Sequence, residues 1–136
     1  MSSLSIRYFA SIAGAAVFLS LANLAWTQQD TVPKKRLQPP AVATGVIGGE
    51  SHAGYEIHAE KGRTMSVELT WEHAEDKRAE FTVSEFANFF DSAPVAFGRV
   101  SDAGKRWTGQ VPMTGDCYVY VVAHPEAQYS LRVTVR

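Results

Sequence analysis

Residues 117–136 read CYVYVVAHPEAQYSLRVTVR, and this stretch decides the fold. In its first half, Cys117, Val119 and Val121 alternate with Tyr118, Tyr120 and Val122. In its second half, the apolar odd positions from Tyr129 to Val135 alternate with Ser, Arg and Thr. A period of two is typical of a β-strand with one face on a core and one face toward water. The intervening segment 124–126 has turn chemistry, so the stretch predicts two strands joined by a tight turn.

The same period of two recurs earlier in the chain. It covers Tyr55–Ala59, Met65–Trp71 and Phe81–Val83, and the turn Lys61-Gly62 separates the first two of these segments. Short alternating strands joined by tight turns favour an all-β fold, an antiparallel β-sandwich of the jelly-roll or Ig-like kind. The exception is Glu85–Gly98, where phenylalanines at near-helical spacing predict one short helix or a loop that covers the core.

The N-terminal part has a different composition. Tyr8–Trp26 is an uncharged and largely apolar run of 19 residues that follows Arg7. We interpret residues 1–25 as a signal peptide, with an uncleaved membrane anchor as the alternative, because about 18 to 20 apolar residues can also span a bilayer. Either interpretation predicts an exported protein, periplasmic or secreted.

A predicted linker and a single predicted domain follow the signal. Residues 26–40 hold three prolines and the basic triplet 34–36 without a periodic apolar face, so we expect a solvated linker. Residues 41–136 form the predicted sandwich domain. Cys117 is the only cysteine, which excludes an intramolecular disulfide, and its position in the alternation predicts burial.

Charge narrows the class of partner. The chain carries 13 basic and 14 acidic residues, and the part from Ala41 onward carries 9 and 13, a net charge of −4. A nucleic-acid-binding domain needs a basic face, so this balance argues against nucleic acid. It is compatible with a cationic protein partner.

Residue types that commonly act in catalysis or bind metals are present, but their spacing in this chain matches no known motif. The four histidines (His52, His58, His73 and His124) have no metal-ligand spacing, so we expect them on the surface. No Gly-x-Ser-x-Gly motif or phosphate-binding glycine loop occurs. We therefore predict no enzyme activity, no cofactor and no metal site.

Aromatic and acidic residues supply the candidate binding surface. Tyr118 and Tyr120 lie on the outward phase of their strand, where tyrosines stack sugars, anchor a protein partner, pack under a second layer or cover a sheet edge. Phe86, Phe89 and Phe90 lie in the exceptional segment and either cover the core or form an exposed patch. The predicted surface comprises Tyr118, Tyr120, Phe89, Phe90 and the acidic residues Glu72, Glu75 and Asp76.

Several short motifs resemble a known family. They are Gly45-Val46-Ile47-Gly48, Tyr55 to Gly62 with its Lys-Gly turn, Trp107 to Pro112, Gly115-Asp116 and Tyr129 to Val133. Together they resemble the bacterial pre-peptidase C-terminal β-sandwich and, among exported single-domain members, the periplasmic inhibitors of goose-type lysozyme. Cys117 stands where the family usually has a tyrosine. Residues 72–106 match the family poorly.

The resemblance implies a sandwich that binds through its loops, because inhibitors of this kind insert loops into the enzyme's cleft. No inhibitory residue carries over to this chain. We therefore expect an exported, non-catalytic binding domain, with a periplasmic lysozyme inhibitor as the leading hypothesis. The alternatives are a module that binds glycan or cell wall, motivated by Tyr118, Tyr120 and Trp107, and a structural domain of the envelope.

Overall fold

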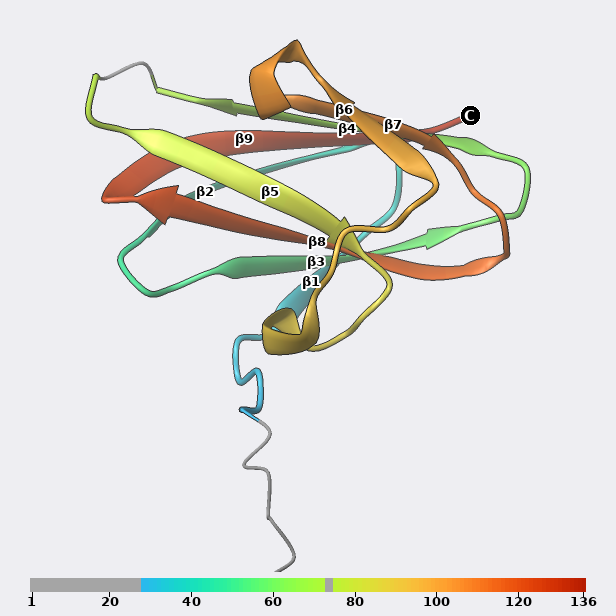
Figure 1. Ribbon diagram of the computed structural model, residues 1–136, viewed down its shortest axis with the longest axis horizontal. Helices are drawn as coiled ribbons and strands as arrows, with labels where there is room; N and C mark the ends of the chain where they lie inside the picture. Colours follow the sequence, from blue (N-terminus) through green and yellow to red (C-terminus); the bar gives the residue numbers. More distant parts are fainter. Residues whose placement is uncertain (1–27, 73–74) are drawn as a thin grey trace, which may run out of the picture.

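The computed structural model describes residues 28–72 and 75–136, and these form nine strands and two short 3-10 turns (Figure 1). The predicted signal segment and His73 lie outside the described residues. The elements are β1 (Lys34–Leu37), β2 (Ala41–Gly48), β3 (Ala53–Ala59), β4 (Thr64–Trp71), β5 (Arg78–Ser84), η1 (Phe89–Asp91), β6 (Gly98–Ser101), η2 (Asp102–Gly104), β7 (Arg106–Gln110), β8 (Gly115–His124) and β9 (Glu126–Val135).

The strands form two sheets that pack face to face (Figure 1). One sheet has the order β1-β3-β8-β5 and the other the order β2-β9-β4-β7-β6. All pairs are antiparallel except β1 with β3, which is parallel. The predicted all-β sandwich is therefore confirmed, with one parallel pair added. The described residues contain no α-helix, and the predicted short helix or covering loop is a loop with the single turn η1.

The core lies between the sheets and is filled by the inward phase of each strand. Ile57, Leu69, Val119 and Leu131 are fully buried, as the period of two predicts. Cys117 is buried, which confirms its prediction, and Trp107 is also buried. Among the buried polar groups, the hydroxyls of Tyr55 in β3 and Tyr129 in β9 lie 2.5 Å apart and so join the two sheets.

The connection between β8 and β9 differs from a hairpin. The tight turn at Pro125 is confirmed, but β8 belongs to the four-stranded sheet and β9 to the five-stranded sheet. The chain therefore crosses from one layer to the other at this turn. Alternation predicts β8 and β9, but it does not predict which sheet either strand joins, since both layers need the same pattern.

The predicted linker is wrong for residues 34–37. Lys34–Leu37 form β1, which pairs in parallel with Gly54–Ile57 of β3. Leu37 is 6% exposed and belongs to the core. Alternation does not predict this strand, because three of its four residues are basic and only Leu37 contributes to the core. The folded domain therefore begins before residue 41.

No helix among the described residues has the length and apolar character needed to cross a bilayer.

Candidate binding surface

The outer face of the four-stranded sheet carries the two tyrosines that alternation places there. The rings of Tyr118 and Tyr120 stack at 6.4 Å between centroids. Tyr120 is only 1% exposed, because the ring of Phe89 lies 5.5 Å from it and its hydroxyl donates a 2.6 Å hydrogen bond to the carbonyl of Phe86. Of the alternatives for Tyr120, the structure shows packing under a second layer. Tyr118 is half-buried.

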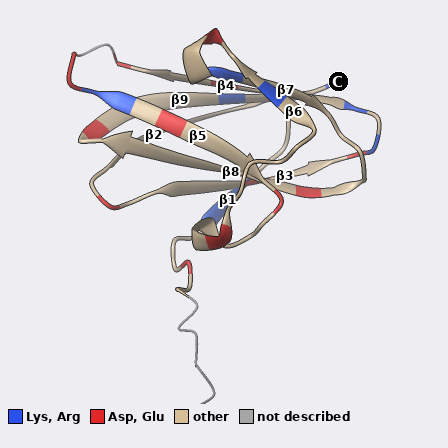
Figure 2. Cartoon of the chain, in the orientation of Figure 1, with Lys and Arg blue, Asp and Glu red and all other residues tan. Residues whose placement is uncertain are grey.

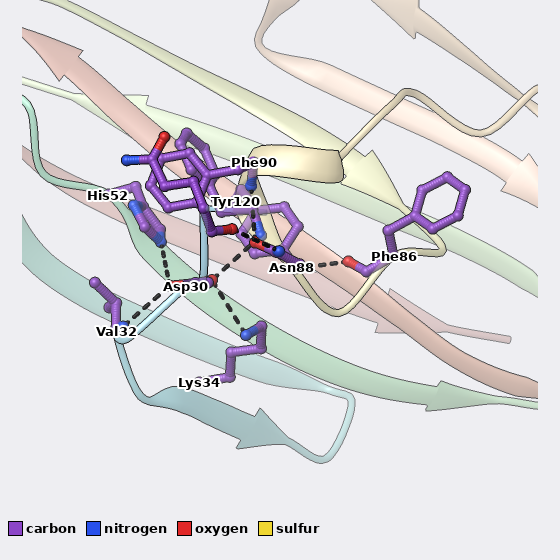
Figure 3. Close-up of polar contacts among 10 residues, drawn as sticks. Asp30, Val32, Lys34, His52, Phe86, Asn88, Phe90 and Tyr120 are labelled. Carbon is purple, nitrogen blue, oxygen red and sulfur yellow. Dashed lines mark hydrogen bonds and ion pairs between the residues drawn. The ribbon is translucent and has the colours of Figure 1, made fainter. Parts of the chain in front are cut away.

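Asp30 holds this second layer together (Figure 3). Its side chain is 3% exposed. Oδ1 accepts a 3.0 Å hydrogen bond from the Val32 amide and lies 3.0 Å from Nε2 of His52. Oδ2 accepts hydrogen bonds of 3.2 Å from Lys34 Nζ and from the Phe89 amide. One carboxylate thus joins the segment before β1, β1 itself, the β2–β3 connection and η1.

The environment of Asp30 favours the charged carboxylate. Burial raises its pKa, but hydrogen bonds from the Val32 amide, Lys34 and the Phe89 amide, together with the charge of His52, outweigh burial and lower the pKa below its usual value. The buried charge is therefore compensated at neutral pH by its donors, as buried carboxylates require.

His52 corrects the prediction of surface histidines. It is 5% exposed, and its ring stacks on Phe89 at 3.9 Å with an interplanar angle of 9°. Its Asp30 partner is 22 residues away. His58 and His124 are exposed as predicted, and His58 Nδ1 lies 2.9 Å from Asp116 Oδ1.

We define the aromatic loop as residues 85–92, and further contacts hold it in place. The Asn88 side chain accepts a 3.1 Å bond from the Phe90 amide and donates a 3.0 Å bond to the carbonyl of Gln28. The Phe86 amide donates to the Ser84 hydroxyl at 3.1 Å. Despite these anchors, Phe86 and Phe90 are 44% and 45% exposed. The loop therefore presents two apolar rings from a fixed backbone.

Acidic residues lie within this loop and beside it. Glu85 and Asp91 lie within it, Glu50 precedes the neighbouring His52, and all three are exposed. Acidic positions are visible on the η1 turn and on the segment after β5 (Figure 2). A hollow of about 400 Å³ beside Phe90 lies between residues 28–32 and 50–52. The loop thus combines apolar rings with an acidic rim.

The structure does not bring all the predicted surface residues together. Glu72, Glu75 and Asp76 are exposed and lie in the connection before β5, whereas the aromatic loop follows the end of β5. A seven-residue strand, roughly 20 Å long, separates the two groups. Glu72 forms an ion pair with Lys77, and this hydrogen bond lowers the pKa of the Glu72 carboxyl.

Of the aromatic residues in the predicted surface, Phe90 is therefore the one that the aromatic loop exposes. Phe86 is exposed on the same loop, whereas Phe89 and Tyr120 pack against each other and support it. No three His, Cys, Asp or Glu side chains gather into a metal-binding group within residues 28–72 and 75–136.

Comparisons with known proteins bear on the fold. No family model matches the chain, and no curated protein matches it. The solved structure of PliG from Aeromonas hydrophila, a periplasmic inhibitor of g-type lysozyme, is similar with a TM-score of 0.61 and 21% identity, over 77% of this chain and 97% of that one.

Two further solved structures are similar. The pre-peptidase C-terminal domain of a collagenase from Bacillus anthracis has a TM-score of 0.56 and 16% identity, over 79% of this chain and 100% of that one. PliG from Salmonella Typhimurium has a TM-score of 0.50 and 16% identity, over 76% and 98%. The resemblance stated from the sequence is thus confirmed at the level of the fold, which at these identities is what such a likeness shows.

Proposed function

We propose that this chain is an exported, non-catalytic domain that binds a cationic protein through its aromatic loop, with a lysozyme as the favoured partner. The observation that carries the proposal is the exposure of Phe86 and Phe90 on a backbone fixed by Asp30 and Asn88. Aromatic rings at the centre of an interface supply much of its binding free energy.

Pre-organisation makes this loop suited to binding. A loop that is already ordered loses little conformational entropy on association, so more of the contact free energy appears as affinity. Here Asn88 bonds both to Phe90 and to Gln28, and Phe89 packs between His52 and Tyr120. Phe86 and Phe90 can therefore each contact an apolar part of a partner's surface without prior folding of the loop.

The acidic rim of Glu50, Glu85 and Asp91 favours a partner with a basic face. Complementary charge around an apolar centre steers association and fixes orientation. The fold likeness to two inhibitors of g-type lysozyme supports a lysozyme as that partner. The other fold neighbour, a collagenase domain, leaves open a different protein of the same charge.

Inhibition of bacterial cell lysis tests the proposal. The mature protein is added to goose-type, chicken-type and invertebrate-type lysozymes at low and at physiological salt. We expect inhibition of at least one class that weakens with salt. The double variant Phe86→Ala/Phe90→Ala should raise the inhibition constant by about tenfold or more, as loss of interface anchors does. The matched control Val46→Ala/Met113→Ala removes two exposed apolar side chains elsewhere and should leave inhibition unchanged.

Two results would contradict the proposal. Absence of inhibition for all three classes would remove lysozyme as the partner, and an equal loss in both double variants would remove the aromatic loop as the contact. The glycan alternative has lost much of its basis because Tyr120 and Trp107 are buried. A pull-down on peptidoglycan distinguishes it directly. The alternative of an anchored envelope domain rests on residues 1–27, which lie outside the described part of the chain.

A further inference from the structure

Strand β5 is the edge of the four-stranded sheet, with β8 on one side. On its other side the Val95 amide donates a 2.9 Å hydrogen bond to the Val83 carbonyl, and among the described residues this is the one backbone bond at that edge. The amide and carbonyl of a residue in an antiparallel strand point the same way, and the direction alternates along the strand. Ala79 and Phe81 therefore also direct their backbone groups away from β8, without a backbone partner there.

A groove of about 390 Å³ runs beside this free edge. Its lining includes the apolar side chains of Trp71, Phe81 and Val100, the last of which belongs to β6. Val100 is 65% exposed. A free strand edge beside exposed apolar side chains is a template for pairing with another strand.

Two opposite charges flank Ala79 near the N-terminal end of β5. Arg78 and Glu80 are exposed on either side of Ala79, and their alternation with buried Ala79 places both side chains on the outer face of the sheet. Neither side chain forms an ion pair within the part of the chain that the structure describes, although seven other pairs do form. These two charges are therefore available to a partner strand.

We propose that β5 pairs with β5 of a second copy of this chain, antiparallel and centred on Ala79, so that the two four-stranded sheets become one continuous sheet. In this register Arg78 lies opposite the partner's Glu80, and Glu80 lies opposite the partner's Arg78. Opposite charges directly across a strand pair stabilise it. The backbone groups of the two Ala79 residues face each other and complete the ladder.

The charges select this register over its neighbours. A dimer centred on Glu80 places two glutamates opposite each other, which is destabilising. A dimer centred on Phe81 requires the Val83 carbonyl, which already accepts the Val95 amide. The register centred on Ala79 uses only free backbone groups and forms two ion pairs.

The other sheet edges are less suited to a defined dimer. Strands β1 and β6 have four residues each. Strand β2 has eight, with Val42 and Val46 exposed, but it carries no charged residue that would fix a register. Pairing through β2 is the alternative that the experiment must separate from pairing through β5.

The proposed dimer is independent of the proposed function. The aromatic loop begins beyond the C-terminal end of β5, about 20 Å from Ala79 at the rise of a β-strand. A two-fold axis at Ala79 therefore sends the two aromatic loops toward opposite ends of the dimer. Both loops remain free, and failure of either proposal leaves the other standing.

Charge reversal combined with sedimentation equilibrium tests the dimer. The wild-type protein should be in a concentration-dependent equilibrium between monomer and dimer. Arg78→Glu or Glu80→Arg alone puts like charges opposite each other twice, so each should raise the dimer dissociation constant by about tenfold. The double variant Arg78→Glu/Glu80→Arg restores opposite charges and should return the wild-type constant. The control Arg99→Glu reverses an exposed arginine on β6 and should have no effect.

A mixture of the two single variants gives the sharpest result. Arg78→Glu has two acidic positions and Glu80→Arg has two basic positions, so the mixture should form a heterodimer although neither variant dimerises well alone. Circular dichroism confirms that each variant is folded. The proposal is overturned if the wild type is monomeric at every concentration, if the mixture does not dimerise, or if Val46→Lys on β2 dissociates the dimer while the β5 reversals do not.

Discussion

A single residue, Asp30, does most to position the aromatic loop. Its two carboxylate oxygens have four partners that come from segments up to 59 residues away in the sequence. Removal of one partner from a buried charged cluster costs more than the value of one hydrogen bond, because the remaining groups stay buried without compensation. Here the groups left behind would be the Val32 amide, the Lys34 ammonium, the His52 ring and the Phe89 amide.

The variant Asp30→Ala should therefore lower the free energy of unfolding by about 2 to 4 kcal/mol. Equilibrium denaturation in urea measures this change. Asp91→Ala is the matched control, because Asp91 is exposed and forms no ion pair among the described residues. It should change the free energy by no more than about 0.5 kcal/mol. Equal effects of the two variants would show that the Asp30 cluster contributes little.

The sequence did not reveal this cluster, for a physical reason. Asp30 and His52 lie in segments without an apolar period, and polar residues in such segments are usually solvated. Their burial depends on the segment before β1 packing against His52 and η1, which is a tertiary event. Tyr120 illustrates the same limit, since alternation placed it on the outer face, where another segment then covered it.

At the scale of the elements, strands with several inward apolar residues were predictable and the remainder were not. Strands β4, β8 and β9 each carry a run of buried residues at every second position, which is a strong signal. Strand β1 contributes only Leu37 to the core, and its other three residues are basic, so its sequence has no alternating pattern. Strand β6 has no buried residue, and its place depends on packing against Trp107 rather than on its own pattern.

That packing gives a prediction for β6. A Cβ atom on Gly98 would lie 2.0 to 2.3 Å from three atoms of the buried Trp107 indole, so Gly98→Ala forces the strand or the ring to move. We expect a loss of about 1 to 3 kcal/mol in the free energy of unfolding, as for other overpacked sites. Gly115→Ala is the control, because its Cβ would meet nothing within 4 Å. Thermal and urea denaturation of both variants measure the difference, and similar stabilities would contradict the close packing of β6 on Trp107.

At the scale of the whole molecule, the sandwich separates its charged and aromatic loops along β5. The acidic residues before β5 and the aromatic loop after it lie at opposite ends of that strand, so the surface predicted from sequence divides into two (Figure 2). The fold was predictable because it follows from alternation and turns, whereas the loops decide which exposed side chains meet. Phe86 and Phe90 are exposed on the same loop, and the segment before β1 anchors that loop through Asp30 and Gln28.

The response of the whole domain to acid follows from its carboxylates. Burial of Asp30 raises its pKa, but its hydrogen bonds outweigh burial and the net pKa is lowered. The His58 hydrogen bond lowers the pKa of Asp116 in the same direction. A carboxyl whose folded pKa lies below its unfolded value, about 4, stabilises the fold above that pH. This stabilisation is lost as the pH falls through the folded pKa. The free energy of unfolding should therefore decrease below about pH 4.

The variant Asp30→Asn isolates the buried carboxylate in this response. Asparagine has nearly the same shape but carries no charge, so the variant should be less stable than the wild type at neutral pH. As the pH falls below about 4, the wild type loses the stabilisation that the variant already lacks, and the difference between the two should shrink. Urea denaturation across the acid range measures both curves. Curves that stay parallel down to the acid limit would mean that Asp30 titrates alike in the folded and unfolded chain, and that the cluster beneath the aromatic loop does not depend on its charge.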